Sequence, residues 1–134
     1  MEPISEHKQF IFNNNIDTQC IESLYEDDLT YIEEVFRLTL QDLHSEVKNL
    51  LTHYQSNDIS SIRRVVHKIK PSFGFVGMPG LQDYCQAFEK RCDEQPPLDV
   101  FKGEFEKWST AIHTSITLLE NELERLTLFN KSVS

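Results

Sequence analysis

Cysteine and glycine are both scarce in this chain, and their scarcity excludes several kinds of site. The 134 residues include three cysteines and four glycines. Cys85 and Cys92 share one predicted helical stripe at a separation of about 10 Å along the axis, too far for a disulfide. No Cys-x-x-Cys pair or adjacent His and Cys indicates a zinc site, so we expect no bound metal. The glycines form neither a phosphate-binding loop nor a nucleotide fingerprint, which argues against a kinase.

Positive charge and long apolar runs are scarce as well. Lysine and arginine total 13 against 22 aspartate and glutamate, which leaves a net charge of −9. The phosphates of a nucleic acid would be repelled by most of such a surface. No stretch of about 18 apolar residues occurs, and residues 1–15 lack a cationic start followed by an apolar core. We therefore expect a cytoplasmic protein that neither binds nucleic acid nor inserts into a membrane.

Alternation typical of strands is absent, and apolar residues recur instead at helical spacing. Four such amphipathic stretches joined by short loops predict an all-α fold, an antiparallel four-helix bundle, with a short additional helix through about Tyr25 that caps one end. We expect one domain over residues 16–127, an N-terminal tail or linker over 1–15 and a C-terminal tail over 128–134. The four stripes run from Ile32 through Phe36 and Leu40 to Tyr54; from Ile59 through Ile62, Val66 and Ile69 to Val76; over Leu81, Cys85, Phe88 and Cys92; and from Phe101 through Phe105 and Trp108 to Leu126.

The few positive charges gather around His67, in the run Ile-Arg-Arg-Val-Val-His-Lys-Ile-Lys over residues 62–70. At about 100° per residue, His67 points about 130° away from the centre of its apolar stripe. It should therefore face water or a partner. The residues on or beside its face are Arg63, Arg64, Lys68, Lys70 and Gly74.

Two further features of this helix suggest contact with another protein. Gly74 and Gly77 are small and would allow close approach of a second backbone. Phe75 lies about 80° around the helix from His67, off the apolar stripe. We expect it to be an exposed docking contact beside the basic face.

The run His-Lys-Ile-Lys-Pro-Ser-Phe-Gly-Phe-Val-Gly-Met over residues 67–78, followed by Leu81, Cys85, Phe88 and Glu89, resembles the signature of histidine-containing phosphotransfer (HPt) domains. These are the relay modules of two-component phosphorelays. The resemblance covers roughly residues 20–127 and rests on several offsets that agree at once. It implies that His67 accepts a phosphoryl group from an aspartyl phosphate on one receiver domain and passes it to an aspartate on another.

The resemblance also implies the roles of neighbouring residues and partners. Lys70 would neutralise charge on the phosphoryl oxygens, and Glu89 would orient the imidazole. Arg63, Arg64 and Lys68 would attract acidic receiver surfaces. The protein would be a phosphocarrier without kinase activity or a cofactor of its own, and Mg²⁺ would be supplied by the receiver domain. The expected partners are response-regulator receiver domains and a hybrid sensor histidine kinase, with the chain acting as a monomer.

Pro71 stands where many members of the family have glycine. A proline inside a helix removes the N–H that would bond the carbonyl four residues back, which here belongs to His67. A kink or loosened turn is therefore expected just after His67.

The alternative function is that of a phosphorylation-independent HPt-like adaptor that binds receiver domains.

Overall fold

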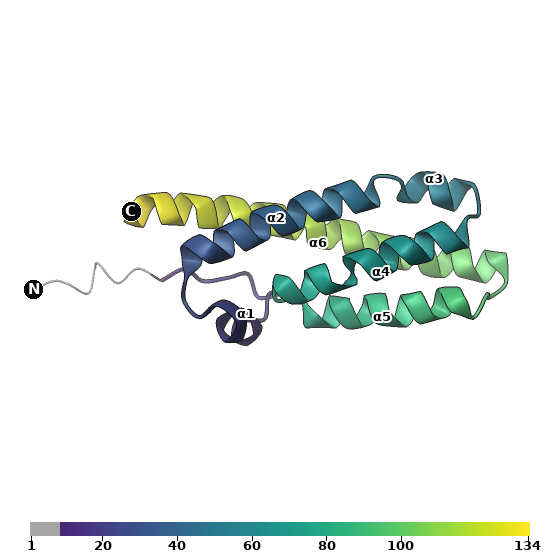
Figure 1. Ribbon diagram of the computed structural model, residues 1–134, viewed down its shortest axis with the longest axis horizontal. Helices are drawn as coiled ribbons and strands as arrows, with labels where there is room; N and C mark the ends of the chain where they lie inside the picture. Colours follow the sequence, from purple (N-terminus) through teal and green to yellow (C-terminus); the bar gives the residue numbers. More distant parts are fainter. Residues whose placement is uncertain (1–8) are drawn as a thin grey trace, which may run out of the picture.

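The computed structural model describes residues 9–134, and over this range the chain is helical without strands. Its six helices, in chain order, are α1 (Thr18–Tyr25), α2 (Leu29–Val47), α3 (Leu50–Gln55), α4 (Ile59–Phe75), α5 (Pro79–Asp93) and α6 (Leu98–Val133). Helix α2 packs against α4 and α6, and α5 packs against the same two helices. Figure 1 shows these four long helices running in alternating directions, with α1 beside the end of α4. The predicted all-α bundle is confirmed.

Three helices begin at an aspartate that caps them. The side chains of Asp17, Asp28 and Asp58 accept backbone N–H groups from the first turns of α1, α2 and α4. Such a cap satisfies one of the N–H groups that a helix start leaves without a partner. The caps set where α1, α2 and α4 begin.

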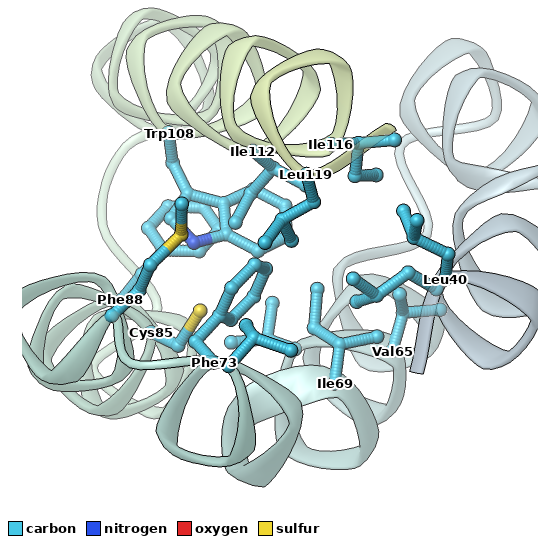
Figure 2. Packing of buried hydrophobic residues seen from close by; sticks show 14 of the residues in the cluster. Leu40, Val65, Ile69, Phe73, Cys85, Phe88, Trp108, Ile112, Ile116 and Leu119 are labelled. Atoms are coloured by element: carbon cyan, nitrogen blue, oxygen red, sulfur yellow. The ribbon is translucent and has the colours of Figure 1, made fainter. Parts of the chain in front are cut away.

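The apolar stripes meet between the four long helices. Trp108 is fully buried, and its ring stacks on Phe88 at 4.9 Å between centroids. Phe73 and Ile69 of α4 point into the same core, which Figure 2 shows in cross-section. Because α4 gives this face to the core, its opposite face is left for solvent.

Three local expectations differ from the structure. The long stretch predicted from residue 32 to residue 54 is interrupted at Lys48 and Asn49, so α3 is a separate short helix. Residues 128–134, expected to be a tail, continue α6 as far as Val133. Helix α4 runs without interruption through Pro71, so the loosened turn predicted after His67 is not found. Pro71 is tolerated because it lies on the exposed face, where solvent can replace the missing donor.

The segment before α1, of which residues 1–8 lie outside the described range, packs on the bundle from residue 9 onward. The ring of Phe12 lies 6.1 Å from that of Phe36, and Arg125 stacks over Phe10 at 4.7 Å. The backbone N–H of Asn13 donates to the buried carboxylate of Glu122. Residues 9–15 are therefore part of the folded unit, whereas the sequence suggested a tail or linker.

Gly77 makes the connection between α4 and α5 possible. Its φ of 75° is in the left-handed region, and an added Cβ would lie 2.9 Å from side-chain atoms of Ile16 and Ile21. We expect Gly77→Ala to lower the free energy of unfolding by about 2 kcal/mol, from backbone strain and steric conflict together. Gly103→Ala is the matched control, because Gly103 lies inside α6 with open space around its Cβ position. It should stabilise the protein by up to about 1 kcal/mol. Urea unfolding of both variants measures the two free energies. Equal changes in the two variants would contradict the special backbone conformation assigned to Gly77.

Candidate functional site

His67 projects from the outer face of α4. Its side chain is 64 % exposed, as expected from its position opposite the apolar stripe. The ring is nevertheless anchored, because its Nδ1 lies 2.8 Å from Oε2 of Glu89 on α5. One nitrogen of the imidazole is thus held by the neighbouring helix, and the ring remains open to a partner.

Glu89 connects the phosphoacceptor candidate to the nearest cations. Its side chain is only 8 % exposed, and its Oε1 accepts a hydrogen bond from Lys70 Nζ at 2.8 Å. Lys70 also donates to Gln86 Oε1 at 2.7 Å. On the other side, Arg63 Nη2 lies 3.4 Å from Glu89 Oε2. His67, Lys70 and Glu89, chosen from sequence as one site, do lie together.

The charge state of Glu89 determines which nitrogen of His67 carries a proton. Burial raises the pKa of this carboxyl group, but hydrogen bonds from Lys70 and His67 outweigh burial and leave the pKa below its usual 4.5. Glu89 is therefore an anion at neutral pH and can only accept hydrogen bonds. In the neutral imidazole the proton must then be on Nδ1, and the lone pair of Nε2 is free.

The remaining basic residues are less free than their sequence suggests. Arg63 Nε donates to Asp93 Oδ1 at 2.6 Å, and Lys68 Nζ lies 3.2 Å from Glu46 of α2. Arg64 is exposed and donates to Ser61 Oγ at 2.8 Å. Carboxylates from α2 and α5 therefore offset much of the positive charge on this face of α4.

Sequence reasoning missed Gln86, Asp93 and Glu46 as parts of this surface. A signal for two of them was present, since Gln86 and Asp93 lie three residues before and four residues after Glu89 on α5. Residues at these spacings share a helix face. No local pattern identifies Glu46, because it reaches Lys68 from a different helix.

Gly74 and Gly77 differ in their surroundings. A Cβ at Gly74 would come within 2.8 Å of Gln82 Oε1, which is the end of a flexible side chain that can move aside. Gly77 is buried, so the expectation that it faces a partner is wrong. Phe75 is 50 % exposed, as expected, and its carbonyl accepts from Tyr25 Oη at 2.8 Å. Helix α1 therefore lies directly beside the surface around Phe75.

The environment of Glu89 predicts how acid affects stability. A carboxyl group whose pKa is lower in the folded than in the unfolded chain stabilises the fold above its unfolded pKa, and this stabilisation is lost as the pH falls. We therefore expect Glu89→Gln to be less stable than the parent at pH 7, with a difference that narrows below about pH 4.5. Urea unfolding at pH 7 and pH 3.5 tests this. A difference that stays constant over this range would contradict the stated charge of Glu89.

Two further kinds of feature are absent from residues 9–134. No helix among these residues is both long and apolar enough to cross a membrane. Nowhere in this range do three or more His, Cys, Asp or Glu side chains gather as potential metal ligands.

The chain is thus a four-helix bundle that displays an anchored histidine on the outer face of α4. The family model described as Hpt domain matches residues 34–127. The chain belongs to the Hpt domain family. No curated protein and no solved structure matches it. The matched range starts within α2, so α1 and the segment before it lie outside the match.

Membership of the family establishes the general role. Hpt domains serve phosphotransfer in two-component systems, as phosphocarriers and not as enzymes. They interact with receiver domains and kinases of phosphorelays.

Proposed function

We propose that this protein accepts a phosphoryl group on Nε2 of His67 from the aspartyl phosphate of one receiver domain and delivers it to the aspartate of another. The observation that carries the proposal is the 2.8 Å contact between His67 Nδ1 and the ionised Glu89. It leaves the lone pair on the nitrogen that a partner can reach. In the forward step an N–P bond forms at Nε2 while the O–P bond of the aspartyl phosphate breaks, and the aspartate leaves as a carboxylate.

Glu89 favours this step for a second reason. Attack by Nε2 places positive charge on the ring, and a carboxylate accepting the Nδ1–H stabilises that charge, as the aspartate of a catalytic triad does for its imidazole. The same carboxylate does not donate a proton to the ring. The return step, in which the phosphoryl group leaves Nε2, restores the neutral imidazole.

Lys70 supplies charge for the phosphoryl oxygens. Its ammonium group has three N–H donors, and Gln86 and Glu89 accept two of them. The third donor remains for a phosphoryl oxygen. Transfer of a phosphoryl group depends mainly on alignment and on such neutralisation.

The surface around His67 suits a receiver domain. Arg64 and Lys68 are exposed cations that would attract an acidic partner, and Phe75 offers an apolar contact. The receiver would bring the Mg²⁺ that its own aspartate chemistry requires, and a hybrid sensor kinase would be the source of the phosphoryl group. We expect the chain to act as a cytoplasmic monomer, since its four helices close their own core.

The test is transfer from a panel of receiver domains, each carrying a radiolabelled aspartyl phosphate and drawn from the source organism. The expected result is a label on this chain that is labile in acid, stable in alkali and located at His67 by peptide mapping. A chain that binds a receiver domain but acquires no label from any of them would overturn the proposal and support the adaptor alternative.

A further inference from the structure

Arg63 contacts two carboxylates of the site. A cation that only attracts a partner would not need such contacts. Its Nε donates to Asp93 Oδ1 at 2.6 Å, while Nη2 lies 3.4 Å from Glu89 Oε2. This is the same oxygen that faces His67 Nδ1. The guanidinium group therefore bridges two carboxylates of α5, one of which contacts the phosphoacceptor.

The orientation of the Glu89 carboxylate is what needs support. The last torsion of a glutamate side chain is broad, so the side chain by itself does not decide which oxygen faces a neighbour. Lys70 holds Oε1, and a carboxylate held at one oxygen can still turn. Arg63 approaches from the other side, next to Oε2. Two cations on different oxygens define the plane of the carboxylate, and with it the direction of Oε2.

We propose that Arg63, anchored by Asp93, is a positioning residue that keeps Glu89 Oε2 directed at His67 Nδ1 and so keeps the reactive lone pair on Nε2. The guanidinium suits this task because its donors have a fixed planar geometry. A lysine at this position would carry the same charge, but it would lack the planar set of N–H donors that can reach two carboxylates at once. For its effect on phosphotransfer the proposal rests on the proposed function, but the position of the imidazole proton can be measured without any phosphoryl group.

The different exposure of Glu89 and Asp93 indicates that removing Arg63 or Asp93 will change the site but not the stability of the fold. Glu89 is 8 % exposed, so its contacts are weakly screened. Asp93 is 56 % exposed, and ion pairs that exposed contribute little to stability. Removal of Arg63 or Asp93 should therefore leave the fold intact, which circular dichroism can verify before any other measurement.

The experiment uses ¹⁵N NMR of the imidazole nitrogens in the full, unphosphorylated chain. At an alkaline pH, where the imidazole is neutral, the parent should show a protonated Nδ1 and an unprotonated Nε2. In Arg63→Ala the two signals of His67 should move toward each other, as the two tautomers become mixed. Asp93→Ala should produce a smaller change in the same direction, and the double variant should equal Arg63→Ala, because Asp93 acts only through Arg63.

Arg91→Ala provides the matched control. Arg91 of α5 also bridges two carboxylates, with Nε 2.8 Å from Glu104 of α6 and Nη1 3.1 Å from Glu94 just after α5, but neither partner contacts His67. Its removal changes the net charge by the same amount and should leave the His67 signals in place. If Arg91→Ala shifts them as Arg63→Ala does, the effect is general electrostatics and the proposal is overturned.

Transfer rates separate the two proposals. With a labelled receiver domain, Arg63→Ala should take up the phosphoryl group about threefold to tenfold more slowly, a partial loss because Lys70 still holds Glu89. Slower uptake with an unchanged imidazole spectrum would mean that Arg63 acts on the partner, which overturns the positioning role and leaves phosphotransfer intact. Failure of the parent chain to acquire any label would instead overturn the proposed function, whatever the spectrum of Arg63→Ala.

Discussion

Replacing His67 with glutamine is expected to abolish phosphorylation of this chain. A glutamine amide has no nucleophilic ring nitrogen, so the label should fall at least about a thousandfold, to background. The fold should be unaffected, because the side chain is 64 % exposed and is not part of the core. The measurement is uptake of label from a phosphorylated receiver domain after a fixed time, with the melting temperature as a check.

His113→Gln is the control for this variant. His113 is an exposed histidine on α6, hydrogen-bonded to the Ser109 carbonyl. It should keep the full label. Retention of label by His67→Gln, or loss of label only in His113→Gln, would place the phosphoacceptor elsewhere.

The largest expected effect on stability comes from Trp108→Ala. Trp108 is fully buried at the centre of the core, stacked on Phe88 and in contact with Phe105. Removing a buried indole loses its transfer free energy and leaves a cavity, which together cost about 3–5 kcal/mol. For a domain of this size the melting temperature should fall by about 10 °C or more.

Leu128→Ala is the matched control for Trp108→Ala. Leu128 lies on the same helix but is 61 % exposed, so the change should be within about 0.5 kcal/mol. Chemical unfolding of both variants gives the two free energies. Equal losses would mean that the extension of α6 contributes as much as the core, contrary to the packing described above.

The fold was predictable from sequence where helical spacing was strong. The stripe through Ile62, Ile69 and Phe73 placed one face of α4 in the core and thereby His67 on the other. The structure confirms both placements. Periodicity works here because burial of one face and exposure of the opposite face follow from the helix repeat alone.

The ends of the bundle were less predictable. Helix α2 stops at Val47 although apolar spacing continues, and residues 9–15 pack on the bundle although they show no periodic pattern. Phe12 packs next to Phe36, and the Ile11 carbonyl accepts from Arg125 far along the chain. Contacts of this kind depend on where separate elements meet, and no window of sequence contains both partners.

The site, too, was predictable only in part from the sequence. The resemblance to HPt domains was sufficient to select His67, Lys70 and Glu89 from the sequence, and their roles remain proposals for the experiments above. The bridge from Arg63 to Asp93 and Glu89 was not visible, and neither was the pairing of Lys68 with Glu46. Arg63 therefore looked like a free surface charge, although it is a partner of two carboxylates.

The order of residues in the chain alone determined an all-helical protein with one histidine set among cations on an exposed helix face. Tertiary structure decided how that histidine is held, because the distance and rotation between α4 and α5 determine which side chains of α5 reach it. Hydrogen bonds act only over about 3 Å, so a small change in helix packing would separate Glu89 from His67. Helix periodicity specifies the direction of a side chain, but only packing specifies what that side chain meets.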